Sequence, residues 1–147
     1  MIVTALLTDG TARIARGRDE CTKLIQYVIS LEHEDSESTL NVGDAAFYQS
    51  LKDGPFPDHQ FRVSVRPSLG LAALNYTDHN DPDMIIADSV NLSPVSPGVR
   101  LIFNGTTGAV FPVAAAIPIG DARRALLQWL DTRNRPTCIQ WVRHDEY

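Results

Sequence analysis

Short segments of alternating apolar and polar residues, joined by tight turns, dominate the middle of this 147-residue chain. Phe61, Val63 and Val65 alternate with polar residues, a period of two that is typical of a strand buried on one face. Asn104 and Gly105 form a two-residue hairpin signal. Connections this short join antiparallel strands, because a parallel pair needs a crossover of a dozen or more residues. The pattern therefore predicts a mostly antiparallel sheet and disfavours a doubly wound parallel one.

The same pattern continues on both sides of this region. Residues 2–8 and 11–15 are rich in β-forming side chains and flank Asp9 and Gly10, another strong turn signal. The predicted strands cover residues 2–8, 11–15, 61–66, 69–76, 84–87, 99–103, 109–113 and 137–143.

One helix is expected near the C-terminus, after Pro118, and another begins near Asp19, a residue suited to cap it. Each has apolar residues at helical spacing, so that they share one face. Those residues are Cys21, Leu24, Ile25 and Val28 in the first helix, and Ala122, Ala125, Leu126, Trp129 and Leu130 in the second. A short third helix is expected over residues 44–51. The sequence thus predicts one α+β domain over residues 1–147, with a mostly antiparallel sheet and about two principal helices packed on it.

Two tryptophans and two cysteines fall within patterned segments. Trp129 lies on the apolar stripe of the second helix and Trp141 on the last strand, so both are expected in the core. Cys21 and Cys138 are expected as two buried thiols rather than as a disulfide.

The histidines give no sign of a catalytic or metal site. His33, His59, His79 and His144 fall in predicted loops or at the C-terminus, and no pair has the spacing of metal ligands. We expect all four to be solvated. Hydrolase, nucleotide-binding and dinucleotide-binding motifs are also missing from the sequence.

The loop at residues 78–83 resembles a calcium-binding loop only superficially. Counted from Asp78, the sixth position is Asp83 where glycine is needed, and the twelfth is Ser89 rather than glutamate. The sequence therefore predicts no catalytic residue, no metal and no cofactor, and we expect a protein that is not an enzyme.

The chain carries a formal net charge of −5. This charge argues against nucleic acid as a direct partner, because neutralising phosphates requires clustered Lys and Arg. No apolar run approaches the roughly 20 residues of a membrane helix, and no signal peptide is recognised. We expect a cytoplasmic protein with no membrane partner.

The C-terminal third has an order of residues that goes beyond periodicity. Pro118 precedes the helix, an Ala-Leu pair occupies positions 125–126, Arg-Pro occupies positions 135–136, and Trp141 ends the last strand. In this order the chain resembles the Imm1 family of immunity proteins, most closely over roughly residues 98–143. Where the family usually has glycine in its Thr-Gly-x-Arg-Pro turn, this chain has Arg133. The conformation of that turn is therefore left open.

The resemblance implies an antitoxin that binds and blocks a toxin encoded beside it, often a nucleic-acid deaminase. It also implies that the shared residues are structural and that the toxin-facing surface varies. From charge and loop placement alone, we expect that surface in the acidic loop at residues 32–37 and the tip at residues 78–83. The candidate toxin-binding residues are Glu34, Asp35, Glu37, Asp78, His79, Asp81 and Asp83. The alternatives are a small-molecule-binding or enzymatic α+β domain and a subunit that self-associates through a sheet edge.

Overall fold

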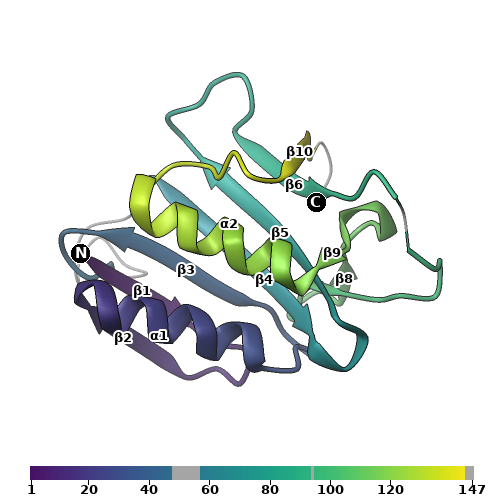
Figure 1. Cartoon of the computed structure of the whole chain (residues 1–147), viewed down its shortest axis with the longest axis horizontal. Helices are drawn as coiled ribbons and strands as arrows, with labels where there is room; N and C mark the ends of the chain where they lie inside the picture. Colours follow the sequence, from purple (N-terminus) through teal and green to yellow (C-terminus); the bar gives the residue numbers. More distant parts are fainter. Residues whose placement is uncertain (48–56, 94, 145–147) are drawn as a thin grey trace.

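A large antiparallel sheet forms the centre of the computed structural model, which describes residues 1–47, 57–93 and 95–144 (Figure 1). Its strands lie in the order β10-β6-β5-β4-β3-β1-β2, and a short strand, β9, pairs with β5. The strands are β1 Ile2–Leu6, β2 Ala12–Arg16, β3 Ser38–Gly43, β4 His59–Arg66, β5 Leu71–Asp78, β6 Ile86–Val90, β9 Ile117–Pro118 and β10 Gln140–Arg143. The predicted antiparallel sheet is confirmed, because every pair of strands in it is antiparallel.

Two α-helices, α1 Gly17–Ser30 and α2 Ile119–Thr132, lie side by side on one face of this sheet (Figure 1). Their apolar stripes meet the buried residues of β4 and β5, and Trp129 packs edge-on against Phe61 with ring centroids 5.2 Å apart. Trp129 is fully buried, as predicted, and Trp141 is half-buried against the same core. The α+β class and the two principal helices are therefore confirmed.

The opposite face of the sheet is covered by a small hairpin. Strands β7 Ile102–Asn104 and β8 Ala109–Val110 form a separate two-stranded sheet, and β7 contacts β4. Phe103 and Phe111 pack there in a second apolar cluster with Ala73 of β5. The guanidinium of Arg62 lies 4.4 Å from the centre of the Phe103 ring.

Several boundaries differ from those predicted. Helix α1 begins at Gly17 rather than beside Asp19, and the Glu20 carboxylate accepts a 2.8 Å hydrogen bond from the N–H of Arg16 at its start. Strand β6 covers Ile86–Val90 rather than residues 84–87, and the Met84 carbonyl before it accepts a hydrogen bond from Arg135. Residues 44–47 are not helical, and the rest of the helix predicted over 44–51 lies outside the described residues.

The expectation of solvated histidines is wrong for three of the four. His33 is 1% exposed, and its ring nitrogens lie 2.8 Å from the Leu31 carbonyl and from the Ser38 hydroxyl. His59 is buried against the sheet, and His144 is largely covered and bonded to the buried Asp88. These rings are buried because the fold supplies hydrogen-bond partners for them. His33 bonds to the nearby Leu31 and Ser38, whereas His59 accepts from the N–H of Val42 and His144 binds Asp88 on another strand.

Both cysteines are free, but only one of them is buried. Cys21 lies on the buried face of α1, where burial raises the pKa of its thiol. Cys138 is exposed, which contradicts the prediction of two buried thiols. It lies before β10, in the turn where Gln128 binds the chain through the N–H groups of residues 137 and 138.

The turn after α2 keeps the conformation that glycine usually adopts. Arg133 has φ 56° and ψ 25°, which makes it the one non-glycine residue with positive φ in the described chain. Its N–H donates to the Trp129 carbonyl at 2.7 Å, and its guanidinium donates to Asp44 at 2.9 Å. The side chain of Arg133 therefore forms an ion pair at a position where the backbone is strained.

Candidate functional site

The two acidic loops identified in the sequence lie at opposite ends of β4. The loop at residues 32–37 contacts the end of this strand at Arg66, whereas the tip at residues 78–83 lies beside its beginning at His59. Eight residues of extended chain separate the two ends by about 23 Å. The predicted contacts thus fall at two ends of the strand. Glu34 and Asp35 line one hollow and the Glu37 carboxylate turns to Gly105 instead, while Asp78, His79, Asp81 and Asp83 lie at the other end.

The first loop is held by its own carboxylates. Glu32 accepts hydrogen bonds from Nε of Arg66 at 2.5 Å, from the N–H of Ser68 at 2.7 Å and from the Ser68 hydroxyl at 3.0 Å. The Ser68 N–H and the Arg66 guanidinium keep the pKa of Glu32 below its usual value. Glu32 is therefore a fixed, ionised anchor for the loop.

Glu37 anchors the other end of this loop. Its carboxylate accepts a hydrogen bond from the N–H of Gly105 at 2.8 Å and lies 3.4 Å from the Arg62 guanidinium. The acidic loop packs closely against Gly105. A Cβ added to this glycine would lie 2.5 Å from the carbonyl oxygen of Asp35. The β7–β8 turn thus requires glycine at this point. Glu37, a predicted contact residue, is largely covered and serves to position the loop.

Between these anchors the chain forms a concave acidic surface. A hollow of about 370 Å³ is lined by Thr8, Asp9, Glu32, Glu34 and Asp35, and we refer to it as the acidic hollow. Glu34 is 65% exposed and its carboxylate lies 3.7 Å from Arg66, while Asp35 is exposed. The N–H of Thr11 lowers the pKa of Asp9, so this carboxylate is ionised at neutral pH.

In the second acidic segment, the tip at residues 78–83, a basic side chain pairs with one of the carboxylates. Arg135 donates to the Asp81 carboxylate at 2.8 Å and lowers its pKa. The carboxylate of Asp81 also accepts hydrogen bonds from the N–H groups of Asp83 and Met84. Asp81 therefore organises the turn, whereas His79 and Asp83 are exposed and Asp78 is half-buried.

Asp58 adds a carboxylate to the tip that the sequence did not indicate. It lies 2.8 Å from Nδ1 of His59 and 2.5 Å from the side-chain amide of Asn80. These contacts, first with His59 and then with Asn80, lower the pKa of Asp58. A shallow depression of about 200 Å³ beside it is lined by Pro57, His59, Gln60, Thr77 and His79.

The sequence-based candidates include Glu34 and Asp35 of the hollow, but not Asp9 beside them or Asp58 at the tip. Asp9 was identified only as a turn residue of the first hairpin, and its place beside Glu34 results from the pairing of β1 with β3. Among residues 1–47, 57–93 and 95–144, no group of three or more His, Cys, Asp or Glu is arranged to hold a metal ion. Within the same residues no helix is long and apolar enough to cross a membrane.

Comparison with known proteins agrees with the resemblance at the C-terminus and extends it to most of the chain. The family model of immunity protein Imm1 matches residues 9–143, which include both helices and every strand except β1. No curated protein matches the chain at a significant level. Because the match covers nearly the whole sequence, the chain belongs to the Imm1 family of immunity proteins.

Proposed function

We propose that this protein binds a cognate toxin and blocks it without catalysing a reaction, and that the toxin is a nucleic-acid deaminase. Membership of an immunity family supports the first part, since an immunity protein implies a toxin partner. The deaminase class follows from the resemblance described above. We place the encounter in the cytoplasm, where free thiols such as Cys21 and Cys138 persist.

The acidic hollow is the observation that carries this proposal. A deaminase must bind an anionic strand and admit a base to its pocket, so its substrate cleft is electropositive. Asp9, Glu34 and Asp35 present carboxylates on a concave surface of a chain with net charge −5. These carboxylates replace phosphates at the cleft, and complementary charge speeds association.

The hollow is the better candidate of the two acidic ends. Its exposed carboxylates Glu34 and Asp35 are adjacent, and the basic side chain near them, Arg66, is bound to Glu32. At the tip, Arg135 pairs with Asp81, and Arg143 donates to the carbonyl of Asp83. We therefore propose Glu34 and Asp35 as toxin contacts, with Glu37 as a positioning residue. Asp78, His79, Asp81 and Asp83 are the alternative contact.

The experiment uses the toxin domain encoded beside this chain. The purified domain is incubated with single-stranded DNA, double-stranded DNA or RNA oligonucleotides, and deamination is measured with and without an equimolar amount of the protein. We expect deamination of one substrate, abolished at a ratio of one to one. Binding without any deaminase activity would refute the deaminase class and leave the immunity role standing. Full activity in the presence of the protein would refute inhibition.

A further inference from the structure

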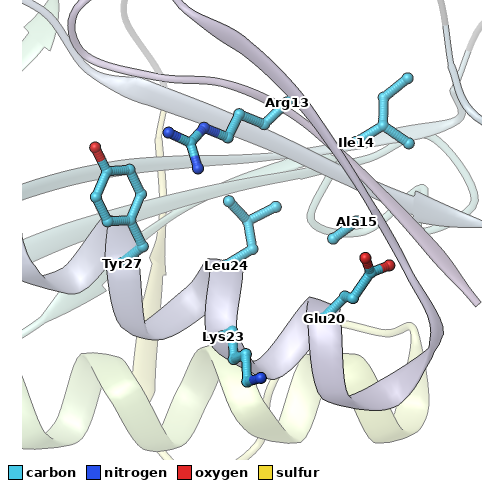
Figure 2. A pocket seen from close by; sticks show the side chains of 7 residues that line it. All are labelled: Arg13, Ile14, Ala15, Glu20, Lys23, Leu24 and Tyr27. Atoms are coloured by element: carbon cyan, nitrogen blue, oxygen red, sulfur yellow. The ribbon is translucent and has the colours of Figure 1, made fainter.

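A groove between the edge strand β2 and helix α1 is a second surface of distinct character. It is an open groove of about 360 Å³ on the helix-covered side of the sheet (Figure 2). Arg13 of β2 and Tyr27 of α1 face each other across it, with the guanidinium 4.7 Å from the ring centre. The lining residues are Arg13, Ile14, Ala15, Glu20, Lys23, Leu24 and Tyr27.

The outer edge of β2 exposes backbone groups that can accept a further strand. Gly17 and Leu7 donate to the carbonyls of Met1 and Thr11, so the odd-numbered residues of β2 bond to β1. The N–H and C=O groups of Ala12 and Ile14 therefore point away from the sheet. At the end of this edge the N–H of Arg16 donates to the Glu20 carboxylate at 2.8 Å.

The side chains along this edge are basic and apolar, in contrast to the acidic chain as a whole. Arg13, Arg16 and Lys23 are exposed, and Glu20 is already bound to the Arg16 N–H. Ile14 is 47% exposed and points to the opposite face from Arg13 (Figure 2). A strand added here would therefore place one set of side chains near Arg13 and the other beside Ile14.

We propose that β2 binds an acidic, extended segment of the toxin as an additional strand of the sheet. This inference rests on the proposed function, because the toxin supplies the strand. Backbone hydrogen bonds to Ala12 and Ile14 give affinity, a carboxylate facing Arg13 in the groove gives specificity, and an apolar side chain covers Ile14. Pairing with a second copy is disfavoured, because it would bring Arg13 and Arg16 of both copies to one seam.

The position of the edge fits a single partner that also occupies the acidic hollow. Asp9 lies in the turn that leads directly into β2, so the hollow and the edge are continuous along the first hairpin. Charge changes sign along this hairpin, from Asp9 at the turn to Arg13 and Arg16 on the strand. This change of charge orients a partner strand along β2, because its acidic residues are attracted toward Arg13 and Arg16 and repelled by Asp9.

The test removes the N–H of Ile14, which points away from the sheet, and keeps the hydrogen bonds between β1 and β2. Ile14→Pro deletes the N–H that faces the proposed strand, and proline is tolerated where an edge N–H faces solvent. Ile14→Val is the matched control, because it keeps the N–H and a β-branched side chain. Titration with the neighbouring toxin domain should show roughly tenfold weaker binding for Ile14→Pro, the effect of one lost hydrogen bond, and little change for Ile14→Val. Arg13→Glu should weaken binding to a similar extent.

Amide hydrogen exchange gives a second measurement that does not depend on how Ile14→Pro folds. In the wild-type complex the amides of Ala12 and Ile14 should become protected, whereas those of Arg13 and Ala15 are protected already in the free protein. Unchanged exchange at Ala12 and Ile14 in a complex that still inhibits the toxin would overturn strand addition alone. Absence of any complex would overturn the proposed function as well. A free protein that is dimeric, and becomes monomeric on Ile14→Pro, would show that a second copy occupies the edge.

Discussion

Nε of Arg66 lies 2.5 Å from the carboxylate of Glu32, and this contact couples the end of β4 to the loop that carries Glu34 and Asp35. Thirty-four positions separate the two residues in sequence. The same carboxylate also accepts both the N–H and the hydroxyl of Ser68. Glu32 is thus the residue that gives the acidic hollow a fixed shape, and its neighbours provide the exposed charge.

Glu32→Ala should lower the free energy of unfolding by about 1 kcal/mol, because three hydrogen bonds to a partly exposed carboxylate are lost together. Glu34→Ala is the control, since its carboxylate makes one long contact of 3.7 Å and the change should stay within about 0.5 kcal/mol. Urea unfolding of the two variants measures the difference. Equal stability would mean that Glu32 does not anchor the loop.

Arg133→Gly should be more stable than Arg133→Ala by about 1 kcal/mol. Both variants lose the contact with Asp44, but glycine adopts the observed φ of 56° without the strain that a Cβ imposes. Thermal unfolding of the pair isolates the cost of the backbone conformation. A glycine variant that unfolds at or below the midpoint of the alanine variant would contradict a left-handed turn.

Stability should decrease below about pH 6.5 because of His33. Burial lowers the pKa of His33 beneath its ordinary value of 6.5, so the unfolded chain binds a proton that the folded chain refuses. The stability contributed by neutral His33 is complete above pH 6.5 and is lost as pH falls toward the lowered pKa of the folded state. Urea unfolding between pH 7.5 and 5.5 should show this slope, and His33→Gln should reduce it. The carboxylates whose pKa is lowered change the stability only at more acidic pH, where they become protonated.

The two thiols should differ sharply in reactivity. Cys138 is exposed, whereas Cys21 is fully buried and burial raises its pKa. A thiol-specific disulfide reagent should therefore modify one equivalent rapidly in the folded protein and the second only after unfolding. Cys138→Ser should abolish the rapid phase. Two rapid equivalents would place Cys21 at the surface.

Local patterns predicted the sheet, both helices and the core because each depends on neighbouring residues. The alternation of Phe61, Val63 and Val65 with polar residues can be seen without knowing which strands pair with β4. The position of Trp129 on the apolar stripe of α2 likewise follows from helical spacing alone. The predictions that were wrong concern the covered histidines His33, His59 and His144 and the exposed Cys138. Whether such a residue is covered depends on how the strands assemble around it. The N–H of His33 donates to the Val65 carbonyl and His144 binds Asp88, two contacts between segments that no local pattern indicates.

The candidate site was predictable only in part for the same reason. Charge alone identified Glu34 and Asp35, but it could not separate them from Glu37 and Asp81, which bind Gly105 and Arg135. Nor could it show that the two acidic segments lie at opposite ends of β4. Asp9 joined the hollow through strand pairing, which no local pattern reveals.

Two double charge reversals distinguish the acidic hollow from the tip. Glu34→Lys with Asp35→Lys, and Asp78→Lys with Asp83→Lys, each add four charges and change the formal net charge from −5 to −1. Long-range attraction is therefore weakened equally. Because the Asp78 carboxylate also accepts the N–H of Asn80 at 2.9 Å, circular dichroism should first show that both variants are folded. The first pair should weaken toxin binding at least roughly tenfold more than the second, as expected for direct charge contacts. A larger loss of binding for the Asp78→Lys, Asp83→Lys variant would show that the toxin contacts the tip instead.

The most direct test of the account is competition between this protein and nucleic acid for the toxin. A fluorescently labelled single-stranded oligonucleotide is bound to a catalytically inactive form of the neighbouring toxin domain, and its anisotropy is followed as the protein is added. The account predicts that the protein displaces the oligonucleotide completely at one equivalent. A ternary complex, in which the anisotropy rises further instead of falling, would show that the acidic hollow does not occupy the substrate cleft and would contradict the proposed mode of inhibition.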